Sequence, residues 1–178
     1  PPTTDEPHYL TVAESLAWDG DLRLAREYGG GLYRKFYPAD RIDPHVVITP
    51  AGEMYAQHTA GLPLLWLPGY ALGGRWGAAA VAAGWSVLLL AGLLAVCRAR
   101  GVGERDALRV GGALGTTAPL LFASATVFTE VPAAALLAWG LAGVLGGPLW
   151  TGPLAGALLP WLHPRYALLS LGLAAARI

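Results

Sequence analysis

The feature that most constrains this chain is a run of 21 residues, 77–97, that contains no charged side chain. An α-helix needs about 20 consecutive apolar residues to cross the hydrocarbon core of a bilayer. Arginines flank the run on both sides, with Arg75 before it and Arg98 and Arg100 after it. The run therefore predicts a membrane-spanning helix over 77–97.

Charge is divided unevenly along the chain. Residues 1–58 hold nine acidic and five basic side chains, net −4, whereas residues 59–178 hold three acidic and seven basic side chains, net +4. The overall net charge of zero argues against a nucleic-acid binder driven by positive charge. A single cysteine, Cys97, excludes a disulfide framework. The division predicts an extracytoplasmic head over 1–60 and a transmembrane helical region over 61–178.

Three more apolar runs follow, over 110–128, 131–147 and 153–176. Residues 163–165 (His-Pro-Arg) interrupt the last run, and each half is too short to span a bilayer. A broken helix, a re-entrant pair and two short elements all remain open there. The Arg-rich segment 98–109 predicts a cytoplasmic loop, which places the head outside. The predicted class is all-α, a polytopic helical protein of a bacterial-type plasma membrane.

Within the head, residues 5–18 predict an amphipathic helix at the membrane surface, because apolar residues from Tyr9 to Leu16 recur at helical spacing. Segment 22–37 predicts a loop with a short helix. Residues 46–48 predict a short extended piece, followed by a turn at 50–52. Residues 61–74, broken by prolines, predict an interfacial helix that leads into the first span.

Two positions carry the sharpest candidate acids. Asp5 and Glu6 open the first helix, where desolvation at a membrane surface would raise a carboxyl pKa toward use as a general base. Acidic residues in a first turn are also favoured by the helix dipole, so a structural role remains open. Glu130 is the only charged residue between Arg109 and Arg165. It is either functional at membrane depth or hydrated in an outer turn.

Four histidines are spread along the chain, and no two have close metal-ligand spacing such as HxxxH. A zinc site needs about four converging ligands, so the sequence predicts no metal site. Single side chains that hydrogen-bond a sugar or a phosphate fit the pattern better. The candidates for such contacts are His8, Tyr9, His45, Tyr55, His58, Glu130 and Arg165.

The string DEPHYL at residues 5–10, which continues to Asp19-Gly20-Asp21, resembles the first extracytoplasmic loop of the GT-C superfamily of polytopic glycosyltransferases. This superfamily includes protein-mannosyltransferase-like enzymes and the aminoarabinose transferase of lipid A. Residues 58–64 are similar to the segment before the second span of that superfamily, although a single Pro63 replaces the usual Pro-Pro. Residues 129–132 resemble the outer turn between its third and fourth spans. The resemblance, together with a start that lacks Met, predicts a fragment from the N-terminal part of a longer protein. The span that precedes this loop in the superfamily would be missing from it.

The resemblance implies a transferase that moves a sugar from a polyprenyl-phosphate donor to a hydroxyl of a lipid, protein or glycan acceptor. Transfer would occur at the outer face of the membrane, among its lipids, with inversion. Asp5 would be the catalytic base, and Glu6 would orient the acceptor or assist a metal. Because family members work with or without a divalent cation, no cofactor is assigned and a divalent cation stays open. The fragment alone is expected to be inactive.

Two alternatives come from other classes of protein. In a non-catalytic transporter or flippase-type protein, Glu130 and Arg165 would line the pathway. In a structural membrane partner, the acidic head would serve for docking.

Overall fold

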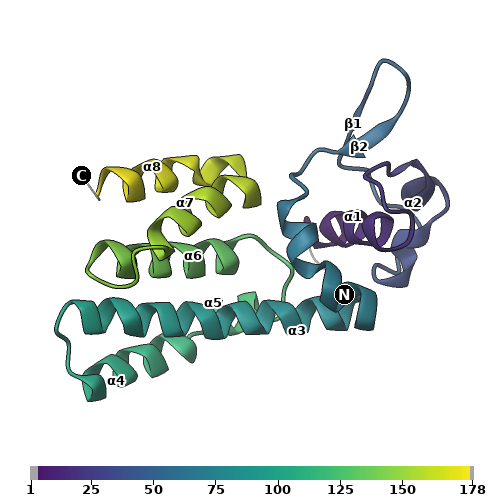
Figure 1. The fold of residues 1–178 in the computed structure, drawn as a ribbon. Helices are drawn as coiled ribbons and strands as arrows, with labels where there is room; N and C mark the ends of the chain where they lie inside the picture. Colours follow the sequence, from purple (N-terminus) through teal and green to yellow (C-terminus); the bar gives the residue numbers. More distant parts are fainter. Residues whose placement is uncertain (1–3, 177–178) are drawn as a thin grey trace. The chain divides into compact units, whose positions relative to one another are not determined.

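The computed structural model describes residues 4–176. Two compact units divide the chain. The N-terminal unit comprises the chain up to Val81 together with Thr126–Phe128, and the helical unit comprises Ala82–Ala125 and the chain from Thr129 onward. The described residues form eight α-helices and one two-stranded sheet (Figure 1). The predicted all-α class is therefore confirmed, with a small hairpin added.

The N-terminal unit contains three short helical segments, a β-hairpin and the first part of a long helix. These are α1 (Glu6–Trp18), α2 (Ala25–Gly29), the 3-10 helix η1 (Leu32–Lys35), β1 (Val46–Ile48), β2 (Met54–Ala56) and the start of α3 (Gly61–Ala99). The strands pair antiparallel, with Val47 opposite Tyr55. The predicted extended piece and its turn are confirmed, as is the short helix within 22–37. Leu62 and Trp66 of α3 are buried, and the compact N-terminal unit extends to Val81.

Helix α1 does not lie on a surface. Residues 6–15 are all buried, including Glu6, Glu14 and Ser15. The prediction of a helix over 5–18 is correct, but the prediction of an amphipathic surface helix is wrong. The apolar stripe is only one of the buried faces of the helix. The other faces can also be buried, because their polar side chains find partners within the unit.

Helix α3 is sharply bent at Gly73 and Gly74. Gly74 has φ +55° and ψ −141°, a conformation that is essentially open to glycine alone. Across the bend, a Cβ atom on either Gly69 or Gly77 would collide with the carbonyl oxygen of the other. The bend separates the predicted interfacial helix from the predicted span. It depends on glycine both at the bend itself, at Gly74, and where the two arms approach each other, at Gly69 and Gly77.

Among the described residues, α3 is the one helix that is long and apolar enough to cross a membrane. Only 17% of its most apolar window is buried within the chain. A core helix of a soluble protein passes the same test of length and composition, so one such helix is weak evidence for a membrane protein. Several residues of α3 are exposed, including Leu72, Trp76, Val87 and Leu88, and the polytopic arrangement stays a prediction.

The helical unit contains the rest of α3 and five further helices. These are α4 (Glu104–Gly115), α5 (Ala118–Ser124), α6 (Glu130–Val144), α7 (Thr151–Leu162) and α8 (Ala167–Ala175), with the 3-10 turn η2 (Pro164–Tyr166) before α8. Helices α6, α7 and α8 pack against one another (Figure 1). Small residues permit this close packing of the helices. A Cβ on Gly140 would lie only 3.0 Å from the Ala155 Cβ and 2.7 Å from Leu173, so a larger residue would not fit there.

Two predicted segments differ from the structure. The span expected over 110–128 is two helices, because the hydroxyls of Thr116 and Thr117 donate to carbonyls of the preceding turn and Pro119 starts a new helix. The loop expected over 98–109 is mostly helical, since α4 begins at Glu104. The runs over 131–147 and 153–176 correspond to α6 and to the pair α7 and α8, whose break at His163 is confirmed.

We predict that Gly77→Ala lowers the free energy of unfolding by about 1–3 kcal/mol, because the added methyl group must push apart the two arms of the bend. The measurement is denaturant unfolding of the purified protein. Gly84→Ala is the matched control, since a Cβ there meets open space among the described residues. It should leave stability unchanged or raise it by up to about 1 kcal/mol. Equal effects of the two substitutions would contradict the close approach.

Candidate functional site

The N-terminal unit gathers one carboxylate and three imidazoles. Asp5 precedes α1, and its Oδ1 lies 3.4 Å from His45 Nδ1. His58 Nε2 lies 3.5 Å from the same His45 Nδ1. The ligand-capable atoms of Asp5, His45 and His58 all lie within 4.8 Å of one another, so these three residues could hold a metal ion. The ring of His8 stacks on that of His45 with centroids 3.8 Å apart.

The β-hairpin explains why histidines 13 residues apart meet. His45 immediately precedes β1, and His58 follows β2 by one residue. Antiparallel pairing of the strands continues beyond them, because Gln57 N donates to His45 O over 3.0 Å. The two histidines therefore emerge together at the open end of the hairpin, and α1 places Asp5 and His8 beside them.

His8 is fixed in position on two sides. Its Nδ1 lies 2.8 Å from the hydroxyl of Tyr28, and its ring stacks on His45. Burial of the ring, followed by the neighbouring His45, lowers the pKa of His8 to about 4. Burial likewise raises the pKa of Tyr28 to about 12. Both side chains are therefore uncharged near neutral pH, and His8 supports the ring of His45 as a neutral group. Tyr9 is buried, and its ring lies 4.9 Å from that of His58.

The structure separates Asp5 from Glu6. The side chain of Asp5 is 43% exposed, whereas that of Glu6 is 1% exposed. Arg75 donates to Glu6 Oε1 from Nε and Nη2, at 3.2 and 3.1 Å. Glu6 therefore joins α1 to the start of the second arm of α3. Sequence reasoning treated the two acids as a pair, but only Asp5 faces the imidazoles.

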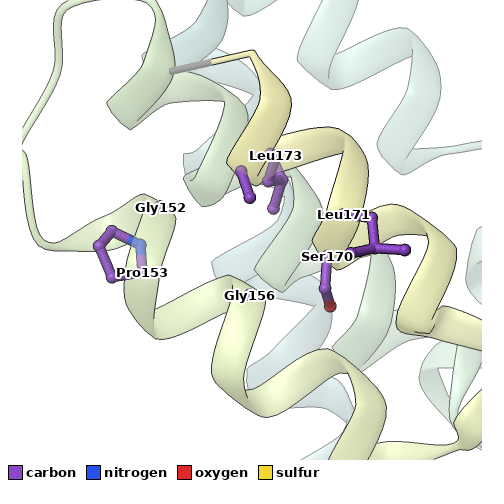
Figure 2. A pocket seen from close by; sticks show the side chains of 7 residues that line it. Gly152, Pro153, Gly156, Ser170, Leu171 and Leu173 are labelled. Atoms are coloured by element: carbon purple, nitrogen blue, oxygen red, sulfur yellow. The ribbon is translucent and has the colours of Figure 1, made fainter. Parts of the chain in front are cut away.

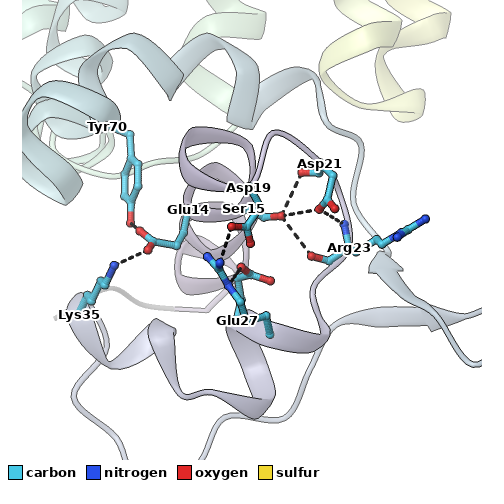
Figure 3. Close-up of polar contacts among 9 residues, drawn as sticks. Glu14, Ser15, Asp19, Asp21, Arg23, Glu27, Lys35 and Tyr70 are labelled. Atoms are coloured by element: carbon cyan, nitrogen blue, oxygen red, sulfur yellow. Dashed lines mark hydrogen bonds and ion pairs between the residues drawn. The ribbon is translucent and has the colours of Figure 1, made fainter.

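A second buried carboxylate joins α1 to two other elements, as Figure 3 shows. Lys35 donates to Glu14 Oε1, and the Tyr70 hydroxyl donates to Glu14 Oε2 over 2.7 Å. At the end of the helix, the Ser15 hydroxyl lies close to oxygens of Asp21 and Arg23. These contacts satisfy the polar side chains of a helix that is buried on all sides.

Glu27 has the least favourable environment of the buried acids. Its carboxylate is fully buried and has no hydrogen-bond partner within the described chain, although Arg26 Nε lies 3.4 Å away. Arg26 also pairs with Asp19 over 2.5 Å. Burial, and then the nearby Asp19 carboxyl, raise the pKa of Glu27. The folded state therefore holds the proton of this side chain to a higher pH than the unfolded chain does.

Three other predicted contact residues lie elsewhere. Tyr55 is in β2, but its hydroxyl contacts Glu53 and Arg23. In the helical unit, Arg165 Nη2 donates to Glu130 Oε1 over 2.5 Å, and the two side chains are 50% and 58% exposed. Glu130, at the start of α6, and Arg165, in η2, thus pair with each other. The transporter alternative would require both side chains to line a passage.

Sequence reasoning missed a basic hollow in the N-terminal unit. It has a volume of about 650 Å³ and is lined by Arg34, Lys35, Arg75 and Trp76, with Phe36, Pro38, Gly73 and Gly74. The adjacent basic residues Arg34 and Lys35 were a signal for it, but the bend in α3 that brings Arg75 there was not predictable from their segment.

A second hollow lies between α7 and α8 in the helical unit (Figure 2). Its volume is about 460 Å³, and its lining is apolar except for Ser170. Since none of the lining residues is titratable, this groove offers no acid–base chemistry.

Comparison of the chain with models of protein families, with curated proteins and with solved structures found no match. The GT-C resemblance therefore rests on the sequence motifs alone.

We predict that Arg75→Ala destabilises the protein by about 3–5 kcal/mol, because it removes the arginine that pairs with the buried Glu6 carboxylate. Denaturant unfolding measures the effect. Arg109→Ala is the control, since the Arg109–Asp106 pair is exposed and should contribute at most about 1 kcal/mol. If Arg75→Ala cost no more than Arg109→Ala, the Glu6–Arg75 contact would not support the fold.

We predict that Glu27→Gln changes the pH dependence of stability. The raised pKa means that the folded state holds a proton the unfolded state has lost, so stability falls as pH rises from the ordinary glutamate range through the folded value. Because glutamine does not titrate, the Glu27→Gln protein should not lose stability in this way as pH rises. The unfolding midpoint of Glu27→Gln relative to the parent should therefore increase as pH rises above the ordinary glutamate range. Asp43→Asn, at an exposed carboxylate, should show no such trend.

Proposed function

We propose that this chain is part of a membrane glycosyltransferase that moves a sugar from a polyprenyl-phosphate donor to an acceptor hydroxyl at the outer face of the membrane. The donor, the membrane topology and the polytopic arrangement are parts of this proposal. The long apolar helix α3 is consistent with a membrane location.

One observation carries the proposal. Asp5 and His58 belong to two separate segments of the GT-C-like pattern, at 5–10 and 58–64, and their side chains meet with His45 at one site. Residues that act on one substrate must converge in the fold, whatever their spacing along the chain. The contact between these two segments therefore supports the use of both in one reaction.

The proposed reaction needs a base that an acceptor can reach. Asp5 would take the proton of the acceptor hydroxyl as its oxygen forms a bond to the anomeric carbon. The bond from that carbon to the lipid phosphate breaks, and its electron pair leaves with the phosphate, so the configuration is inverted. The 43% exposure of Asp5 suits this role, whereas Glu6 is buried in its contact with Arg75. Glu6 in this proposal positions α1.

The donor phosphate would need cationic partners. The hollow lined by Arg34, Lys35 and Arg75 offers guanidinium and ammonium groups, which bind phosphate by charge-assisted hydrogen bonds. Lys35 and Arg75 already pair with Glu14 and Glu6, and Arg34 Nη2 donates to the backbone oxygen of Asp40. Arg34 therefore carries the charge that is least neutralised within this hollow by the contacts described.

The test uses the protein expressed in full from its gene and purified in detergent, with a polyprenyl-phosphate sugar as donor. Asp5→Asn should lower the rate of transfer by about 100-fold or more, since a positioned general base contributes at least that factor. Asp43→Asn is the matched control, because its carboxylate is 87% exposed and pairs only with Arg41 in the contacts described. Undiminished turnover by Asp5→Asn would overturn the assignment of the base.

A further inference from the structure

We infer that Asp5, His45 and His58 form a binding site for a divalent transition-metal ion, for which Zn²⁺ is the best match. The proposal concerns metal binding alone and does not rest on the transferase reaction.

The distances between the three side chains fit metal ligands. A tetrahedral Zn²⁺ with ligands at about 2.1 Å separates neighbouring ligand atoms by about 3.4 Å. The Asp5 Oδ1–His45 Nδ1 and His45 Nδ1–His58 Nε2 distances are 3.4 and 3.5 Å, and all three atoms lie within 4.8 Å of one another. The two shorter distances therefore match the separation between neighbouring ligand atoms of a tetrahedral ion.

Hydrogen bonding explains the same contacts less well. Hydrogen bonds from N–H to oxygen are usually 2.7–3.2 Å long, shorter than either contact. A neutral His45 ring carries at most one proton on Nδ1, and that atom faces both a carboxylate oxygen and a second imidazole nitrogen. If His45 Nδ1 accepts a hydrogen bond from His58, the same unprotonated nitrogen also faces the acceptor oxygen of Asp5. A shared cation satisfies all three atoms at once.

The donor set selects the class of metal. Two imidazole nitrogens and one carboxylate oxygen suit Zn²⁺ and its first-row neighbours better than Mg²⁺ or Ca²⁺, which prefer oxygen ligands. Three protein ligands leave one tetrahedral position for water or substrate, as in catalytic zinc sites. The side chains of Asp5 and His45 are 43% and 42% exposed, so an ion has a path of entry.

The surroundings hold the ligands in place. His45 is stacked against His8, which is itself fixed by Tyr28, and the ring of Tyr9 lies against that of His58. Such outer partners orient metal ligands and contribute to affinity. Binding through Oδ1 would leave the second oxygen of Asp5 able to accept a proton, so the ion and the proposed base are compatible.

The test is direct metal binding, without any sugar donor. The purified protein, stripped with a chelator, is titrated with Co²⁺ as a spectroscopic probe, and Zn²⁺ is then added in competition. We expect the visible absorption bands of low-coordinate Co²⁺, their displacement by Zn²⁺ but not by Mg²⁺, and about one Zn²⁺ retained per chain by elemental analysis. Wild-type protein that shows no such bands and retains no Zn²⁺ would overturn the proposal without recourse to any variant.

Variants then assign the ligands. His45→Gln and His58→Gln should each weaken Zn²⁺ affinity by more than about tenfold, a loss seen even for outer partners of a metal. His163→Gln, in the helical unit, is the matched control and should bind Zn²⁺ as the wild type does. Circular dichroism of each variant shows whether it folds. Folded His45→Gln and His58→Gln proteins that bind Zn²⁺ as well as His163→Gln would overturn the assignment. A wild-type protein that binds Zn²⁺ but transfers no sugar would count against the transferase alone.

Discussion

The N-terminal unit depends on the ion pair between Glu6 and Arg75. A helix buried on every side cannot carry an uncompensated carboxylate, because the cost of removing that charge from water is several kcal/mol. Arg75 meets this requirement from α3, 69 residues away along the chain, and Lys35 and Tyr70 do the same for Glu14. The position of α1 is therefore fixed by charge as well as by apolar packing, and α1 in turn fixes Asp5 and His8.

The bend in α3 is what makes this ion pair geometrically available. Arg75 directly follows Gly74, whose positive φ lies within the bend, and Gly69 and Gly77 approach each other closely across it. A straight helix would carry Arg75 further along its axis at about 1.5 Å per residue. Glycine at these positions thus connects a local backbone conformation with the satisfaction of a buried charge.

Much of the secondary structure follows from the sequence, but its burial does not. The helix at 5–18, the strand at 46–48 and the break at His163 each have a local signal in spacing or in turn residues. The surface location expected for α1 is wrong because periodicity identifies one apolar face and is silent about distant partners for Glu6 and Glu14. The run over 110–128 shows a second limit. It contains no charged residue, yet Thr116, Thr117 and Pro119 divide it into two helices through their effects on backbone hydrogen bonding.

The candidate site shows most clearly where linear spacing fails. His45 and His58 have no metal-ligand spacing along the chain, yet a hairpin brings their nitrogens to 3.5 Å. The residues between them are mainly strand and turn, so the register of β1 and β2 determines the distance between the two rings. His45 and His58 lie just beyond the paired strands, where His45 is opposite Gln57. The hairpin is therefore as much a part of the site as the histidines, since it brings two imidazoles that are 13 residues apart in the sequence close together in space.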